Sequence, residues 1–141
     1  MPRIMGIDYG TKRTGIAVTD PLQIIASGLT TVPTNELFDF LKNYFQEEEV
    51  EKIVVGEPMH ADGNPAQIAP HVVGFVRKLK KEFPAIEVAM HDERYTSVMA
   101  KEVIMQSGTR QKKRRDKSLV DKVAAALILE DYMKNNEWRN G

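Results

Sequence analysis

Apolar and β-branched residues gather in three short segments near the start of the chain, and turn residues separate them. The segments are RIMGID (3–8), TGIAVTD (14–20) and IIASGLTTV (24–32), and their Ile, Val and Thr content is typical of strands. The short link YGTKR, which contains Gly10, favours a hairpin between the first two. The pattern therefore predicts three consecutive strands in a meander.

Further along, the apolar spacing becomes helical and alternates with short apolar runs. Helical spacing predicts an amphipathic helix over 34–49 and a second that ends near Phe83 and starts either at Asn64-Pro65 or near Pro70. It predicts two more helices over 97–108, ended by Gly108, and over 118–136. Apolar runs at 52–56 and 85–90 predict the fourth and fifth strands.

This order of elements is typical of an α/β fold with a mixed sheet. An antiparallel meander would be continued by strands that are joined through helical crossovers, with helices on the faces of the sheet. A chain of 141 residues, 42% of them hydrophobic, fits one compact domain over 1–141. We therefore expect one site to hold the chemistry.

Composition narrows the kinds of chemistry that the chain can perform. It contains no cysteine, which excludes disulfides, thiolate zinc sites and cysteine nucleophiles, and leaves carboxylates and histidines as metal ligands. No apolar run is long enough to span a bilayer, and the first residues do not form a signal peptide. We expect a cytoplasmic protein with no membrane partner.

The formal net charge of zero hides a strongly basic segment. RQKKRRDK (110–117) holds six basic residues against one acid, whereas EEEVE (47–51) is acidic. The basic segment is either a phosphate-tracking loop or a solvated connector. Other basic residues adjoin acids at strand ends. The candidate nucleic-acid-binding residues are Lys12, Arg13, Arg94, Arg110, Lys112, Lys113, Arg114 and Arg115.

Three acids stand at element boundaries and could carry chemistry. Asp8 follows the first strand, Glu93 lies in HDERYTS after the fifth, and Asp121 lies near the start of the last helix. Each also has a structural interpretation: Asp8 could open a turn, Glu93 could be a solvated residue before a helix cap, and Asp121 could complete a capping box with Ser118.

Asp121 also shares a helical face with apolar residues. Positions 121, 124, 125, 128 and 132 lie on one face, and a buried carboxylate there requires a cation or hydrogen-bond donors. Clustered carboxylates repel each other unless a divalent cation neutralises them. Oxygen ligands select hard ions, here Mg²⁺ or Mn²⁺, which can activate water for attack on phosphorus.

Four segments resemble those of the YqgF/RuvX family, in the same order and over essentially the whole chain. They are GIDYGTKRTGIAV, VVGEPMHADG, HDERYTS and VDKVAAALIL. The resemblance implies an RNase H-like fold with strand order 3-2-1-4-5. It also implies metal-dependent phosphodiester cleavage at the 5′ end of pre-16S rRNA, with catalytic and metal-binding acids at Asp8, Glu93 and Asp121.

One position departs from the family pattern. Glu57 follows the fourth strand, where this family usually has an apolar residue and Holliday junction resolvases of the same fold have an acid. It could therefore join or replace Glu93, although DER is the family's own motif and favours Glu93.

Several functions remain open from the sequence. The first hypothesis is a Mg²⁺- or Mn²⁺-dependent nuclease that acts on structured pre-rRNA, and the runner-up is a resolvase of branched DNA. Junction resolution implies a symmetric dimer, so a weak homodimer stays open, whereas trimming of RNA ends requires none. The alternatives are an RNA-binding ribosome-assembly factor without activity and an ATP-binding kinase-type protein. The length of the chain argues against the kinase-type protein.

Overall fold

The computed structural model describes residues 2–57, 69–92 and 117–140. Five strands form one sheet in the order β3-β2-β1-β4-β5. The β1–β2 and β2–β3 pairs are antiparallel, and the β1–β4 and β4–β5 pairs are parallel. This confirms the predicted mixed sheet and its strand order. The strands are β1 (Arg3–Asp8), β2 (Arg13–Thr19), β3 (Ala26–Pro33), β4 (Val50–Glu57) and β5 (Glu87–Asp92).

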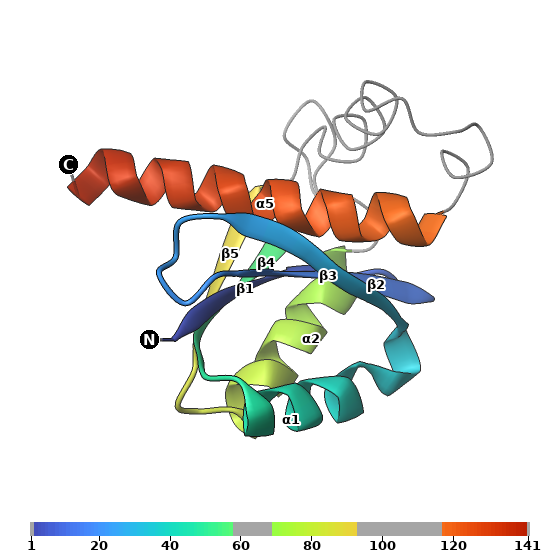
Figure 1. Ribbon diagram of the computed structural model, residues 1–141. Helices are drawn as coiled ribbons and strands as arrows, with labels where there is room; N and C mark the ends of the chain where they lie inside the picture. Colours follow the sequence, from blue (N-terminus) through green and yellow to red (C-terminus); the bar gives the residue numbers. More distant parts are fainter. Residues whose placement is uncertain (1, 58–68, 93–116, 141) are drawn as a thin grey trace.

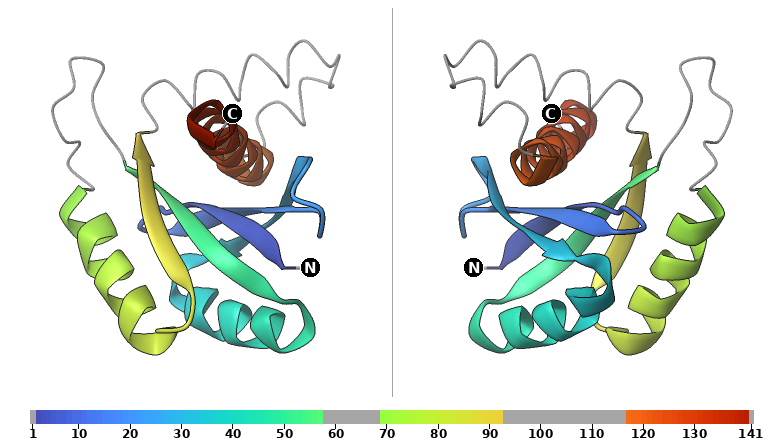
Figure 2. Two further views of the ribbon diagram at one scale, coloured as in Figure 1. Left: turned by 90° about the vertical axis from the view of Figure 1, so that its left-hand side faces the viewer. Right: turned by 90° about the vertical axis from the view of Figure 1, so that its right-hand side faces the viewer.

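Helices cover both faces of the sheet. A single turn of 3₁₀ helix, η1 (Thr34–Glu36), leads into α1 (Leu37–Glu47), which lies with α2 (Ala69–Glu82) on one face. The long helix α5 (Lys117–Asn140) crosses the other face, over β1, β2 and β3 (Figures 1 and 2). None of the helices in these described ranges has both the length and the apolar composition that a membrane span requires.

The two faces of the sheet are packed with side chains of different sizes. On the α1 and α2 face, Met5, Ile7 and Ile53 pack with Leu41 and Phe75, among other large residues. On the α5 face, the cluster consists of Ala17, Ala26, Val54, Ala125, Ile128 and Leu129. Three of these six residues are alanines, and Gly6 and Gly15 lie on the same face, where the backbone of α5 approaches the sheet closely.

Two predicted strands are displaced from their observed positions. Ile24 and Ile25, predicted in the third strand, lie in the loop before it and are 66% and 64% exposed. Asp20 explains this, because its carboxylate accepts hydrogen bonds from the backbone N–H groups of Leu22, Ile24 and Ile25. The fifth strand starts later than predicted, because the Ile86 N–H donates to the Phe83 carbonyl in a turn.

The helix predictions hold where the structure describes them. The helix predicted over 34–49 is divided into η1 and α1, and α5 extends the helix predicted over 118–136 at both ends. Helix α2 is described from Ala69, next to the later of its two predicted starts. The earlier start, in 58–68, and the helix predicted over 97–108 lie outside the described residues.

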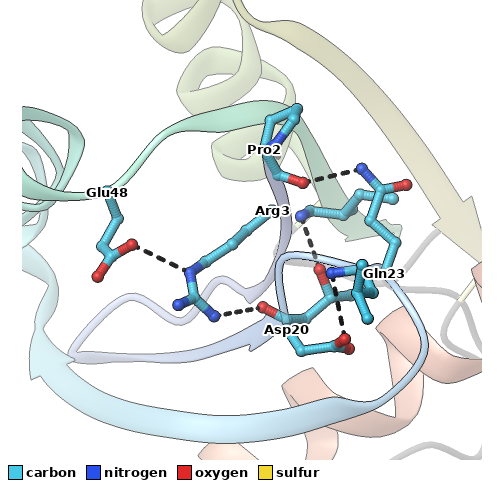
Figure 3. Close-up of polar contacts among 8 residues, drawn as sticks. Pro2, Arg3, Asp20, Gln23 and Glu48 are labelled. Carbon is cyan, nitrogen blue, oxygen red and sulfur yellow. Dashed lines mark hydrogen bonds and ion pairs between the residues drawn. The ribbon is translucent and has the colours of Figure 1, made fainter.

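Polar contacts fasten the end of the sheet where β1 begins (Figure 3). Arg3 pairs through Nε with Glu48 at 3.2 Å and donates from a terminal nitrogen to the Thr19 carbonyl at 2.9 Å. Gln23, at a positive φ of 58°, donates from its side chain to the Pro2 carbonyl. The candidate acids lie at the opposite end of β1.

Candidate functional site

Asp8 is the last residue of β1 and faces helix α5. Side chains alternate along a strand, and Met5 and Ile7 pack on the α1 and α2 face. Ile4 packs with the α5 cluster, and a Cβ on Gly6 would lie 2.9 Å from the Ala125 carbonyl oxygen. Asp8 lies two residues after Gly6 and four after Ile4, so it shares their face of the strand. Its partly exposed carboxylate therefore lies on the α5 face.

Gly15 brings the start of α5 beside Asp8. In the antiparallel register Asp8 is the Cα partner of Gly15, and directly paired residues have their side chains on the same face. A Cβ on Gly15 would lie only 2.1 Å from the backbone oxygen of Asp121. Because Gly15 has no side chain, the backbone at Asp121 rests on β2 next to Asp8. The structure thus places these two predicted acids at one end of the sheet.

Asp121 forms an ion pair with Arg13 across this contact. Arg13 Nε donates to Asp121 Oδ2 at 2.8 Å, and the two side chains are 40% and 22% exposed. Arg13 lies two residues before Gly15 on β2 and so shares its face. Helix α5 already includes Lys117, so Ser118 is not its N-cap. The position of Ser118 within the helix argues against the capping-box interpretation of Asp121.

The packing predicted for the Asp121 face of α5 is confirmed. Ala124, Ala125 and Ile128 are almost fully buried, and Tyr132 is partly buried. Asp121 stands at the exposed end of this stripe, where a carboxylate keeps contact with solvent and with Arg13. The helix thus presents an acid at the edge of its packing face.

The turn between β1 and β2 carries Lys12 and is held by Thr34. The Thr34 hydroxyl donates to the Gly10 carbonyl at 2.6 Å, and its N–H donates to the Lys12 carbonyl at 3.0 Å. A Cβ on Gly10 would lie 2.2 Å from the Arg13 carbonyl oxygen, so the turn requires glycine there. Lys12 is exposed in this turn, which follows Asp8 in the sequence. The sequence placed Thr34 only at the start of the helix predicted over 34–49, and no local pattern indicated that it supports this turn.

Glu57 lies on the other face of the sheet from Asp8. It ends β4 and is the register partner of Asp92 on β5. Val54 packs in the α5 cluster and Val55 in the opposite one, so alternation assigns Glu57 to the α1 and α2 face. This placement argues against Glu57 as a third acid beside Asp8 and Asp121.

His91 packs against α5 as a structural residue. Its Nε2 lies within hydrogen-bond distance of Asp131 Oδ2, and its ring packs edge-on against Tyr132, with centroids 6.0 Å apart. Nearby, the Lys52 ammonium donates to the Tyr132 hydroxyl at 2.8 Å, and this hydrogen bond raises the pKa of Lys52. These contacts fix the far part of α5 on β4 and β5, away from Asp121.

The remaining predicted site residues lie outside the described residues. They are Glu93, Arg94, Arg110, Lys112, Lys113, Arg114 and Arg115. Within the described part of the chain, no group of three or more His, Cys, Asp or Glu side chains could hold a metal ion. Asp8 and Asp121 nevertheless fit as two of the ligands of a hard cation, since both supply carboxylate oxygens at one partly exposed edge.

A separate groove lies between α1 and α2. Tyr9 stacks on Phe75 in its wall, with ring centroids 4.6 Å apart. Lys42 and Lys78 line it together with Asp39 and Glu82, so its charges are mixed. The stacking shows a packing role for Tyr9.

Comparisons with known proteins identify relatives over nearly the whole chain. The family model RuvX, described as Holliday junction resolvase, matches residues 2–135. A protein of Flavobacterium johnsoniae named "Putative pre-16S rRNA nuclease" is 49% identical over 98% of this chain and 100% of its own length. Proteins with the same name from Christiangramia forsetii and Porphyromonas gingivalis are 50% and 49% identical over 94% and 96% of this chain, and 98% of each of their lengths.

Two solved structures share the fold. The fowlpox virus resolvase in complex with substrate Holliday junction DNA matches with a TM-score of 0.57 at 12% identity, over 94% of this chain and 97% of that one. RuvC of T. thermophilus in complex with Holliday junction substrate matches with a TM-score of 0.55 at 20% identity, over 94% and 96%. The fold is therefore RNase H-like, and the chain belongs to the RuvX family.

Proposed function

We propose that this protein is a nuclease that hydrolyses phosphodiester bonds at the 5′ end of pre-16S rRNA, as a cytoplasmic step of ribosome biogenesis. The observation that carries the proposal is the convergence of Asp8 and Asp121 at one end of the sheet, with Arg13 beside them. Relatives that are about half identical over nearly the whole chain carry the name "Putative pre-16S rRNA nuclease", which supports the proposal.

Asp8, Glu93 and Asp121 are the proposed catalytic and metal-binding acids. Together they would hold Mg²⁺ or Mn²⁺, which, when bound, activates water and stabilises the leaving oxygen in attack on phosphorus. Asp8 and Asp121 supply carboxylates from two elements whose relative position is fixed by backbone contact. Glu93 follows β5, the strand next to β4.

Basic residues hold the substrate backbone in this proposal. Lys12 is exposed in the turn after Asp8, and Arg13 lies beside Asp121. Arg94 adjoins Glu93 in the sequence, and the segment 110–117 precedes α5. Cations next to a group of carboxylates offset the repulsion between those carboxylates and a polyanionic substrate.

Resolution of Holliday junctions is the second candidate function. The observation that favours it is the fold shared with two resolvases whose structures contain junction DNA. Junction resolution requires two active sites on a symmetric dimer, whereas trimming of rRNA ends does not. The third candidate function is that of an RNA-binding ribosome-assembly factor without nuclease activity.

A cleavage assay with matched variants tests the proposal. We expect the wild type to cleave structured pre-16S rRNA with Mg²⁺ or Mn²⁺ and to be inactive with chelator. Loss of a direct ligand exceeds the loss of about 10–100-fold seen for groups that only support a ligand, so D8N should lose cleavage by more than about 100-fold. The variants E93Q and D121N should behave alike. E57Q, on the opposite face, and D39N, on α1, should keep wild-type rates.

The substrates offered in parallel separate the candidate functions. Cleavage of four-way DNA junctions but not of RNA would favour the resolvase, and binding of RNA without turnover would favour the assembly factor. D8N that is folded by circular dichroism and cleaves at the wild-type rate would remove Asp8 from the mechanism.

A further inference from the structure

Arg13 and a divalent cation require the same carboxylate. Arg13 Nε donates to Asp121 Oδ2 at 2.8 Å, and Asp121 is one of the two described acids that fit as metal ligands. A charge-assisted bond of this length occupies a lone pair of the oxygen that a metal would use. The pair is only partly buried, so the two cations can exchange without a large desolvation penalty.

The contact uses one edge of the guanidinium group. Arginine carries five N–H donors in a planar fork, which suits both carboxylate and phosphate. Arg13 extends from β2 on the face that carries Asp8 and lies two residues from Gly15, on which the Asp121 backbone rests. The side chain is 40% exposed, so a phosphate at the sheet edge can reach it.

We propose that Arg13 is a positioning residue that holds Asp121 by its carboxylate, lowers the affinity of Asp121 for divalent metal and transfers to the phosphate of the substrate. The inference rests on the proposed function, because it assigns Asp121 to the metal. It gives Arg13 two successive partners, a carboxylate and then a phosphodiester. Metal and nucleic acid should therefore bind with positive coupling, since each relieves the competition for the other.

Calorimetric titration with Mn²⁺ tests the competition. Partly exposed ion pairs are weak, so R13Q should bind Mn²⁺ about two- to fivefold more tightly than the wild type. R13K keeps the charge and should restore an affinity close to that of the wild type. K12Q is the matched control, because it removes one positive charge from the neighbouring turn.

A purely structural role for Arg13 predicts the opposite sign. Without its support, Asp121 would be misplaced, and R13Q would bind Mn²⁺ more weakly. Weaker or unchanged binding by R13Q that is folded by circular dichroism, or equal tightening in K12Q and R13Q, would overturn the inference. A wild type that binds no Mn²⁺ would instead overturn the proposed metal site, and this inference with it.

Binding of a labelled single-stranded RNA provides the second readout. In wild-type protein, Mn²⁺ should strengthen the binding of a labelled RNA whose phosphodiester bonds are modified against cleavage, compared with binding of the same RNA in chelator. In R13Q, RNA binding should weaken and the enhancement by Mn²⁺ should shrink. An enhancement of the same size in R13Q as in the wild type would contradict the transfer of Arg13 to phosphate.

Discussion

Gly15 decides where the carboxylate of Asp121 stands relative to β1. Any side chain at this position would start 2.1 Å from the Asp121 backbone oxygen and 2.9 Å from the Lys122 nitrogen. These are backbone atoms of a helix, so they cannot rotate away as a flexible side chain can. Helix α5 would have to move, and Asp121 would move with it.

We therefore expect G15A to lower both stability and activity. Overpacking typically costs about 1–3 kcal/mol, so the free energy of unfolding in urea should fall by about that amount. G74A is the control, because Gly74 lies in α2 with nothing within 4 Å of an added Cβ. G74A should gain about 0.5–1 kcal/mol, the helical advantage of Ala over Gly.

Cleavage at a temperature where both glycine variants are folded separates the two effects. G15A should lose activity there, whereas G74A should keep it. A G15A variant with the unfolding curve of the wild type would show that α5 does not press on β2 at this point.

At the residue scale, the places of Asp8 and Asp121 in the fold could be predicted from the sequence, whereas the Arg13 partner of Asp121 could not. Asp8 could be placed because it ends an apolar strand, and Asp121 because its spacing sets it on the packing face of a helix. The Arg13–Asp121 pair joins positions 108 residues apart, and no local pattern encodes such a contact. Similarly, the sequence predicted that Gly15 lies in a strand, but it did not predict that helix α5 rests on this glycine.

At the scale of elements, the connection between β2 and β3 is organised by Asp20. Its carboxylate accepts backbone hydrogen bonds from Ile25 at 2.7 Å and Ile24 at 2.8 Å. These bonds favour the charged form, so they lower the pKa of Asp20 below its ordinary value of 3.8, with the Ile25 bond the largest cause. Ile24 and Ile25 are exposed as a result of this arrangement.

The pH dependence of this connection follows from the lowered pKa. A carboxylate whose pKa is lowered on folding stabilises the protein above its unfolded pKa and loses this effect as the pH falls through the folded value. The titration midpoint of Asp20, followed by NMR, should lie below 3.8. D20N should be less stable than the wild type at neutral pH, and the difference should shrink below pH 3.8. A midpoint at or above 3.8 would contradict the assignment.

Element types could be predicted from periodicity, whereas element ends depended on side-chain contacts. The apolar run at 24–32 reads as a strand from its composition, yet the Asp20 carboxylate competes for the first backbone N–H groups. The run at 85–90 was displaced by a turn after Phe83. In both cases a local hydrogen bond outweighed strand propensity, which is weak and depends on context.

At the scale of the whole molecule, charge is balanced in number but not in position. The chain has 20 basic and 20 acidic residues, so its attraction for nucleic acid must come from local groups. The segment 110–117 carries the densest positive charge. Because phosphate binding releases counterions, each contact leaves a measurable dependence on salt.

Neutralising this segment should weaken RNA binding and its salt dependence together. With Lys112, Lys113, Arg114 and Arg115 changed to Gln, the slope of log affinity against log salt should fall by up to about 3, at about 0.7 per phosphate contact. The control removes the same charge from the exposed side chains of α2, on the opposite face, by changing Arg77, Lys78, Lys80 and Lys81 to Gln. Equal slopes for both variants would show that the segment 110–117 acts only through total charge.

The two faces of the sheet contribute differently to stability and to the position of the candidate acids. On the α1 and α2 face, large aromatic rings such as Phe38 and Phe75 pack against each other. On the α5 face, the backbone of the helix rests on the backbone of the sheet at Gly6 and Gly15. A protein engineer can therefore redesign the aromatic layer to raise heat tolerance while the spacing of the reactive groups stays as the backbone sets it. Tyr9 should stay unchanged in such a redesign, because it follows Asp8 and stacks on Phe75.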